Sequence, residues 1–249
     1  MHLVHSIAAS RSYLGGEPRL PQDVEWPQKD GKPLDFIARL SISEIRTAQP
    51  IDWLPSSGAL LFFYSIEHQP WGFDPRNRGE FAVLHVPDLP EALPCAIQRE
   101  PSASIHSRNV DVRSIATYPT SYERVAQLQN FQLSDNEHEA LSDMAEAQFR
   151  GEPKHQVAGY PACVQGDHME LECQLVTNGL YCGDEKGYRD PRSKELEAGA
   201  TNWRLLLQFD SDDKLGVMWG DCGTLYFWVE EHRSRVGDFS NAWVIQQCG

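Results

Sequence analysis

The sequence predicts a β-rich α+β fold, in which two mostly antiparallel β units related by an internal duplication are joined by a short helical middle segment. Three observations lead to this prediction. Continuous apolar and aromatic runs, bounded by Gly, Pro and Asp, recur in both halves, as is typical of buried strands. The middle of the chain has helical composition with almost no Gly or Pro. The two halves also share a similar order of short motifs.

The first half contains three predicted strands, at residues 36–40, 59–64 and 81–86. They follow a loop in which four prolines between residues 18 and 33 disfavour a helix. Ser41 and Glu44 have the spacing of a capping box, which predicts a short helix after the first strand.

The middle segment is predicted to form two helices, over residues 122–129 and 134–149. Ser134 and Glu137 form a capping-box pattern at the start of the second. Leu141 and Met144 continue an apolar stripe at helical spacing, and Gly151 is a suitable C-terminal stop.

The second half is predicted to return to strands. Residues 169–176 read as a strand, and Asp190-Pro191 as the start of a short helix that ends at Gly199. Further strands are expected at 203–209, from 217 to 219 after a turn, at 224–229 and at 242–247.

The duplication is predicted from repeated order. LGGEP at 14–18 resembles VAGYP at 157–161, and each is followed by a predicted strand, at 36–40 and 171–175. Each half then reaches a glycine-led aromatic strand, 58–64 and 223–229. We therefore expect one domain over residues 1–249, with halves at about 10–118 and 152–249 joined by a helical segment at about 119–150.

Charge limits the classes of partner. The 249 residues include 22 Lys and Arg against 36 Asp and Glu, a formal charge of −14. This balance argues against binding to nucleic acid or to an anionic membrane surface, and it suits a basic protein partner. The sequence contains no apolar run of about 18 residues, so no membrane span is predicted.

The cysteines are expected to be reduced. The first residues lack the pattern of a signal peptide, so we expect a cytoplasmic protein. None of the six cysteines forms a Cys-x-x-Cys pair, and buried free thiols are the expectation.

The densest group of carboxylates is an acidic turn with Asp210, Asp212 and Asp213, followed closely by Asp221. Closely spaced carboxylates can bind a hard cation such as Ca²⁺ or Mg²⁺, although the spacing does not match an EF-hand. Asp also suits turns because it bonds its own backbone. Both interpretations stay open, so any metal is left unknown.

Four further residues are candidates for ligand binding. Gly15 and Gly16 permit close backbone approach but precede a proline-rich loop, not a helix, which weakens a phosphate-site interpretation. Trp26 lies within that loop, and Trp219 opens the compact sequence WGDCG. A reactive Cys222 would need a base and a positive environment, which the nearby acids oppose.

Histidines give no diagnostic pattern. His2 and His5 have a chelating spacing near the N-terminus, and His155 and His168 could meet Cys163 or Cys173 in space. A Cys/His metal site is conceivable, yet no ligand pair has the spacing of a zinc motif.

No catalytic residue or cofactor is predicted, because the sequence lacks a Walker A loop, a Gly-x-Gly-x-x-Gly helix start and a Gly-x-Ser-x-Gly elbow. The leading hypothesis is a non-enzymatic binding or accessory module with a protein partner. The alternative is a divalent-cation- or small-ligand-dependent enzyme that uses the turn from Asp210 to Asp213 with Asp221. The oligomeric state is left open.

The chain resembles the YwqG-like family, a bacterial domain of unknown function. The matching motifs are LGGEP at 14–18, EWP at 25–27, GKPL at 31–34, FIARL at 36–40, GALLFFY at 58–64, HQVAGYP at 155–161, LLQFDSD at 206–212, WGDCGTLYF at 219–227 and QC at 247–248. One departure is Val157-Ala158-Gly159, where a Gly-Gly pair is more typical. The resemblance implies a duplicated β-rich α+β fold and no established activity, cofactor or site residue. It also implies an accessory gene, in some cases beside toxin loci, which suggests an immunity or partner role.

Overall fold

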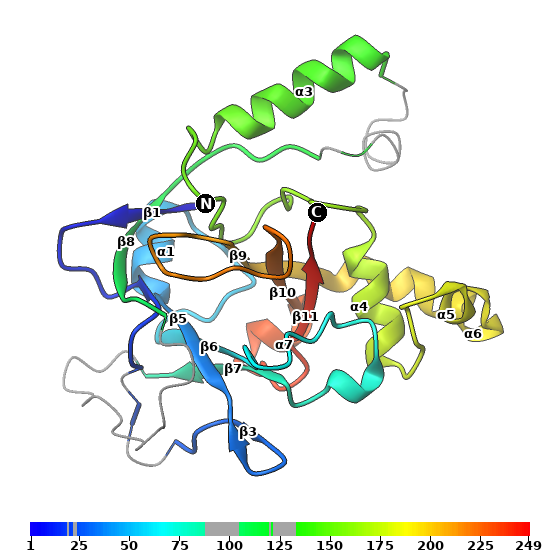
Figure 1. The fold of residues 1–249 in the computed structure, drawn as a ribbon, viewed down its shortest axis with the longest axis horizontal. Helices are drawn as coiled ribbons and strands as arrows, with labels where there is room; N and C mark the ends of the chain where they lie inside the picture. The colour runs from blue at the N-terminus through cyan, green and yellow to red at the C-terminus, as the bar shows by residue number, and fades with distance from the viewer. Residues whose placement is uncertain (19, 22–23, 88–104, 120, 122–132) are drawn as a thin grey trace.

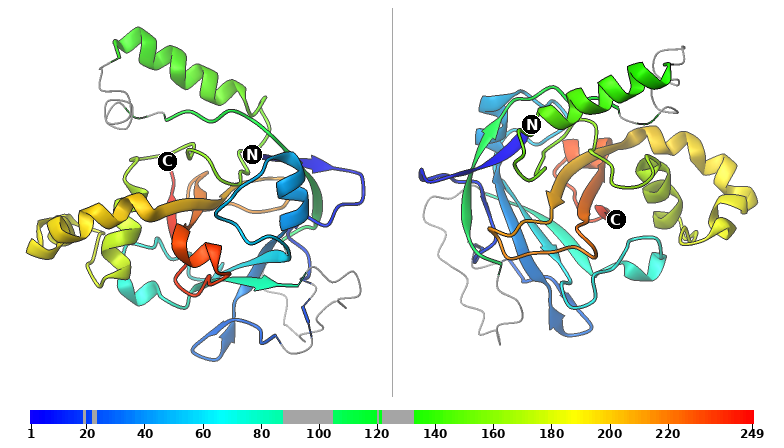
Figure 2. Two further views of the ribbon diagram at one scale, coloured as in Figure 1. Left: turned by 180° about the vertical axis from the view of Figure 1, so that it is seen from behind. Right: turned by 45° about the horizontal axis from the view of Figure 1, so that its top comes forward.

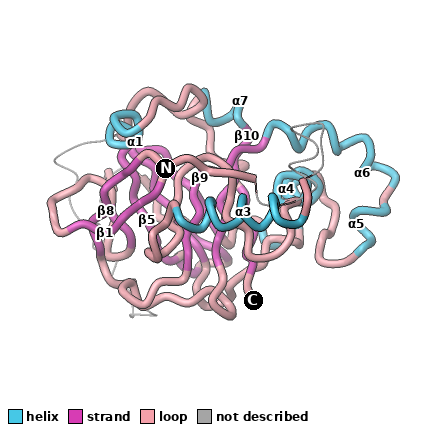
Figure 3. The backbone as a smooth tube through the Cα atoms, turned by 90° about the horizontal axis from the view of Figure 1, so that it is seen from above, coloured by secondary structure: helices cyan, strands magenta, loops and turns pink. Residues whose placement is uncertain are grey.

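The protein has the predicted β-rich α+β fold (Figure 1). A computed structural model describes residues 1–18, 20–21, 24–87, 105–119, 121 and 133–249. Within these residues every strand pair is antiparallel. Strands group at the centre of the molecule, and most helices lie toward its margins (Figure 3).

The larger sheet has the strand order β1-β8-β2-β5-β6-β7. Its strands are β1 His2–Ser6, β2 Tyr13–Leu14, β5 Asp35–Ser41, β6 Ala59–Tyr64, β7 Phe81–Val86 and β8 Arg108–Arg113. A separate small hairpin pairs β3 Gln28–Lys29 with β4 Lys32–Pro33. The predicted strands at 36–40, 59–64 and 81–86 are confirmed, whereas the more polar strands β1 and β8 were not predicted.

The second sheet has the order β11-β10-β9. Its strands are β9 Trp203–Asp210, β10 Thr224–Glu230 and β11 Trp243–Gln247. The predictions at 203–209, 224–229 and 242–247 are confirmed. The strand expected at 217–219 is wrong, because Val217 makes only an isolated bridge to Asp212 and the chain turns again before β10.

Both sheets contain a bulge in the first strand of a three-stranded meander. In β5 the residue Ile37 is extra, because Phe36 pairs with Phe63 and Ala38 with Phe62. In β9 the extra residue is Leu206, between the pairs of Leu205 and Leu207 with β10. Each bulge bends its strand and increases the local twist.

The two sheets enclose a shared apolar core. Phe62 of β6 packs edge-to-face on Phe227 of β10, with ring centroids 5.3 Å apart, and Phe81 of β7 packs on Trp243 of β11 at 4.9 Å. The Tyr64 hydroxyl crosses the core and donates to Gln246 Oε1 at 2.7 Å. Figure 2 shows the two sheets facing each other.

The helices are short. They are α1 Ile42–Ala48, α3 Asp135–Ala147, α4 Met169–Thr177, α5 Glu185–Arg189, α6 Pro191–Leu196 and α7 Glu231–Arg235, with 3₁₀ turns at Pro75–Asn77 and Glu197–Asn202. The predicted helix 122–129 lies outside the described residues.

The two predicted capping boxes differ in outcome. The capping box at Ser134 is confirmed. The backbone N–H of Ser134 donates to Glu137 Oε2 at 2.9 Å, and its hydroxyl contacts the same oxygen at 2.6 Å. At α1 the helix is correct but the box is wrong. Glu44 accepts hydrogen bonds from Ser10 Oγ and from the Arg11 backbone N–H instead.

The predicted strand at 169–176 is wrong, since these residues form helix α4. Their apolar positions fit both a strand and a helix period, and Met, Glu, Leu and Gln favour a helix. Met169, Cys173 and Val176 face the core at helical spacing. The predicted match between residues 171–175 and 36–40 is therefore wrong as well.

In the part of the chain that the structure describes, no helix is long and apolar enough to cross a membrane.

Candidate functional site

Two histidines converge on one buried carboxylate. Asp212 Oδ2 lies 2.6 Å from His5 Nε2 and 3.1 Å from His155 Nε2. The His155 and Asp212 side chains are 1% and 2% exposed, and His5 is 13% exposed. We call these three residues the His–Asp–His cluster.

Three separate segments position the cluster. His5 lies on β1, opposite Val110 of β8. The carbonyl of His155 accepts a hydrogen bond from Leu3 N–H at 2.9 Å, which fixes its segment against β1. Asp212 opens a turn, and its Oδ1 accepts the Lys214 backbone N–H at 2.7 Å, as Asp often does in turns.

The hydrogen bonds define where the protons lie. His155 Nδ1 accepts the backbone N–H of Asp210 at 3.1 Å, so the neutral ring carries its proton on Nε2 and donates it to Asp212. Burial alone would raise the pKa of Asp212. The hydrogen bonds from His155, His5 and the Lys214 N–H outweigh burial and hold this pKa well below its ordinary value.

As arranged in this structure, the three side chains form a hydrogen-bond centre and not a set of metal ligands. Among the described residues they are the one group of three or more His, Cys, Asp or Glu with ligand atoms close enough to share an ion. Two ligands on a tetrahedral zinc lie about 3.4 Å apart, whereas His5 and Asp212 approach to 2.6 Å. In this arrangement His155 Nε2 carries the hydrogen-bonded proton, which a metal would have to displace. The cluster is therefore a charge-assisted hydrogen-bond centre.

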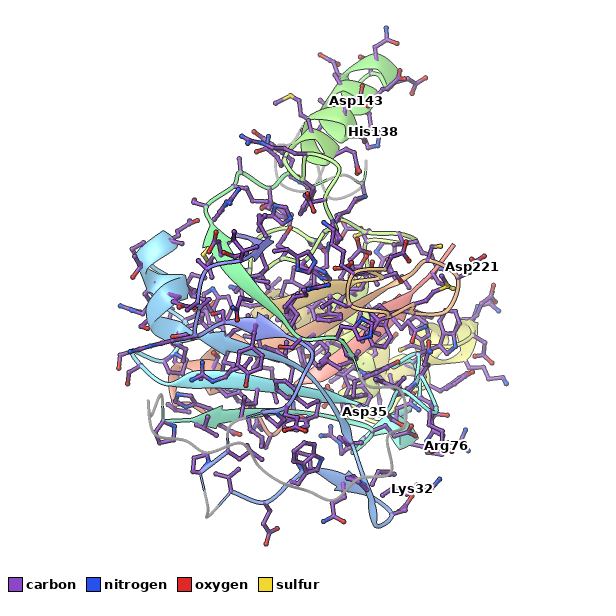
Figure 4. All side chains as sticks on the ribbon, turned by 60° about the vertical axis from the view of Figure 1, so that its left-hand side comes forward. Lys32, Asp35, Arg76, His138, Asp143 and Asp221 are labelled. Carbon is purple, nitrogen blue, oxygen red and sulfur yellow. The ribbon has the colours of Figure 1, made fainter. Side chains whose placement is uncertain are left out.

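The four carboxylates of the predicted acidic turn are not brought together. Asp210 Oδ2 accepts the Lys154 N–H and its Oδ1 accepts the Thr224 hydroxyl, both at 2.8 Å. Asp212 belongs to the His–Asp–His cluster, while Asp213 and Asp221 are exposed (Figure 4 labels Asp221). No three of them are close enough to share a cation. Turn and packing contacts account for Asp210 and Asp212.

The predicted glycine pair supports close backbone packing. Gly15 N–H donates to Ile37 O at 2.7 Å and Gly16 N–H to Ile105 O at 2.9 Å. Gly15 has φ of 65°, and a Cβ there would lie 2.4 Å from His106 O. These contacts explain the glycines without a phosphate.

The two candidate tryptophans have different surroundings. Trp26 donates from Nε1 to Leu34 O at 2.9 Å and packs on Phe63, over the outer face of the larger sheet. Trp219 is buried in the core against Tyr64 and Phe209. Cys222 beside it is exposed, with φ of 49°. All cysteines in the described residues are free.

Buried glutamines hold in place the segment 154–166, which includes His155 of the His–Asp–His cluster. Gln208 donates to Lys154 O at 2.7 Å and accepts the Ala162 N–H at 2.9 Å. Gln247 accepts the N–H groups of Val164 and Gln165, both at 3.0 Å, and donates to Gly166 O at 2.7 Å. This role was not predicted, although a glutamine inside an otherwise apolar strand is a signal of a buried polar contact.

Helix α3 projects away from the body of the protein (Figures 1 and 2). None of its 13 residues is buried. It is attached near its C-terminal end, where buried Phe149 packs edge-to-face on His2 at 5.0 Å and Lys154 pairs with Glu146 at 2.6 Å.

A family model described as a domain of unknown function, DUF1963, matches residues 12–248. The chain belongs to the DUF1963 family. The DUF1963 match includes His155, Asp212 and α3, whereas His5 on β1 precedes it. No curated protein matches the chain. The narrower resemblance to YwqG-like proteins and the bacterial origin stay predictions.

Proposed function

We propose that this DUF1963 protein is a non-enzymatic binding module that docks a basic protein partner on helix α3. The observation that carries the proposal is the helix itself, an acidic amphipathic arm with no buried residue. An accessory or immunity-type role, which the YwqG-like resemblance implies, is one form of such partner binding. The proposal places the protein in the cytoplasm, where free thiols stay reduced.

The charge of α3 favours a cationic partner. The helix contains five acidic residues and no Lys or Arg: Asp135, Glu137, Glu139, Asp143 and Glu146. Glu137 caps the helix and Glu146 pairs with Lys154, so these two have structural roles. Glu139 and Asp143 are exposed, and Figure 4 shows Asp143 on the part of α3 that stands clear of the body. Such a cluster attracts a basic surface over a Debye length of about 8–10 Å.

The helix also offers apolar contact area. Met144 is 50% exposed, and Leu141 and Ala145 are only partly covered. A 13-residue helix without tertiary packing is marginal in water, so a partner that covers this stripe would stabilise it. Helix-in-groove recognition uses anchors at this spacing.

The alternative of a cation-dependent enzyme on the acidic turn has less support, because the four carboxylates do not converge. The geometry favours the binding module.

The proposal is tested with a photo-crosslinker at exposed Ala140 in extract of the native host. We expect capture of a protein through a basic segment, with binding that weakens as salt rises. The double variant Glu139→Lys/Asp143→Lys should weaken binding at least tenfold. The matched control Glu195→Lys/Glu197→Lys makes the same charge change at exposed positions in α6 and the turn after it. Equal loss in both variants, or full binding by the first, would count against docking on α3.

A further inference from the structure

A cleft of about 270 Å³ lies between the edge of the larger sheet and the chain just after α3. Its lining includes Arg113 of β8 and Arg150, with Phe149 and Ile115 as apolar neighbours. We propose that this cleft binds a small organic anion, with its carboxylate or phosphate between the two arginines and its apolar body against Phe149 and Ile115.

The two arginines have donors available for a ligand. Arg113 makes an ion pair with Asp111 at a long 3.5 Å, and both side chains are exposed. Arg150 makes no ion pair among the described residues. A guanidinium carries five N–H donors in a planar fork that matches carboxylate and phosphate oxygens. Two such groups in one cleft contrast with the net charge of −14 of the chain.

The other titratable groups of the cleft do not cancel this charge. Glu152 lies at 2.9 Å from Lys214 Nζ, and this hydrogen bond lowers the pKa of Glu152, so the carboxylate is already paired. His2 donates from Nε2 to Pro153 O at 2.9 Å. Burial lowers the pKa of His2, so the ring is neutral at pH 7 and the positive charge comes from the arginines.

The shape of the cleft suits a small ligand. Its volume is close to the lower end of the roughly 300–1,000 Å³ range of ligand pockets. Val4 and Ala147 add to the apolar lining, and the contact of Phe149 with His2 fixes one wall. The backbone of Arg150 has a left-handed φ of 54°, which is uncommon for a residue other than glycine. Arg150 directly follows the buried Phe149 in the sequence.

This inference does not depend on the proposed function, because it uses no acidic side chain on the exposed face of α3. The two also fail separately: substitutions of Glu139 and Asp143 should leave anion binding intact.

Isothermal titration of the full chain at low salt tests the proposal with three probes: 3-phenylpropanoate, phenyl phosphate and the neutral 3-phenylpropanamide. We expect at least one anion to bind, and the amide to bind at least tenfold more weakly. Binding of the carboxylate alone would identify an organic acid as the ligand class, and binding of phenyl phosphate alone a phosphate ester.

Arginine variants assign the binding to this cleft. Arg150→Gln and Arg113→Gln should each weaken anion binding at least tenfold, whereas Arg192→Gln, at an exposed residue of α6, should not change it. Arg150→Lys keeps the charge and should retain part of the affinity. Thermal unfolding of each variant checks that it folds. The proposal is overturned if neither anion binds, if the amide binds equally well, or if both Gln variants bind as the unmodified protein does.

Discussion

His155 Nε2 lies 3.1 Å from Asp212 Oδ2 and links two segments that are 57 residues apart. The same carboxylate oxygen forms a hydrogen bond with His5 of the N-terminal strand β1, 207 residues away in the sequence. One buried charge therefore ties β1, the 154–166 segment and the turn after β9 to one another. We expect the cluster to contribute to stability as a unit.

Asp212→Asn should destabilise the protein by about 3 kcal/mol, because it removes the charge that both histidines bond in a buried site. Urea unfolding measures the change. Asp213→Asn, at the exposed neighbouring position, is the matched control and should change stability by less than about 0.5 kcal/mol. Similar losses of unfolding free energy in both variants would show that the cluster does not stabilise the protein.

Acid should weaken the protein through Asp212. The folded-state pKa of this carboxyl is held below its unfolded value, so its contribution is fully present above about pH 4. It is lost as the pH falls below that value, because the unfolded state then binds the proton more readily. Unfolding free energies between about pH 4.5 and 3 should fall more steeply in the unmodified protein than in Asp212→Asn. Parallel curves would contradict this assignment.

Glu172 should produce the opposite slope. Burial raises the pKa of Glu172 to about 7, although the Tyr188 hydroxyl at 3.2 Å partly favours the ionised form. The unfolded state loses this proton near pH 4.5 and the folded state keeps it, so stability should fall as the pH rises from about 4.5 to 7. Glu172→Gln should remove this decrease, with a gain of about 2 kcal/mol above pH 7. A variant that keeps the slope would exclude Glu172 as its source.

Local patterns predicted the interior strands well. The continuous apolar runs at 59–64 and 224–229 admit few other structures, and both are strands. The strand prediction for residues 169–176 was wrong because their apolar positions fit both the strand period and the helix period. Only packing against the core selects the helix. The two bulged meanders, β5-β6-β7 and β9-β10-β11, have the order that a duplication would leave, but the duplication itself stays a prediction.

The site was predicted only in part. Asp212 was singled out as one of several turn carboxylates, and His5 and His155 only as separate metal candidates. Their meeting depends on strand pairing between β1 and β8 and on the bridge from Gln156 to Gln208, which no spacing in the sequence encodes. The role of Gln247 was not predicted, because a glutamine among apolar strand residues signals a buried polar contact but can equally face solvent.

Gln247→Ala should loosen the segment 164–166. The side chain satisfies the N–H groups of Val164 and Gln165 and the carbonyl of Gly166, and its loss leaves polar groups unpaired at a cost of about 2 kcal/mol. Amide hydrogen exchange at residues 164 and 165 should become faster, while exchange in β6 should not change. Gln49→Ala, at an exposed residue after α1, is the control. Unchanged protection at 164 and 165 would contradict the role of Gln247.

The loop between β6 and β7 should be intolerant of a side chain at Gly72. Its carbonyl accepts Trp243 Nε1 at 2.7 Å, and a Cβ there would lie 1.7 Å from Val244 O of β11. Because the obstacle is backbone, Gly72→Ala should cost about 3 kcal/mol or more. Gly179→Ala is a matched control, with a similar φ of 89° but no atom within 4 Å of the added carbon. It should cost only about 1 kcal/mol, from backbone conformation alone. Chemical denaturation of both variants measures the difference, and equal costs would mean that the loop does not pack against β11 as closely as this structure shows.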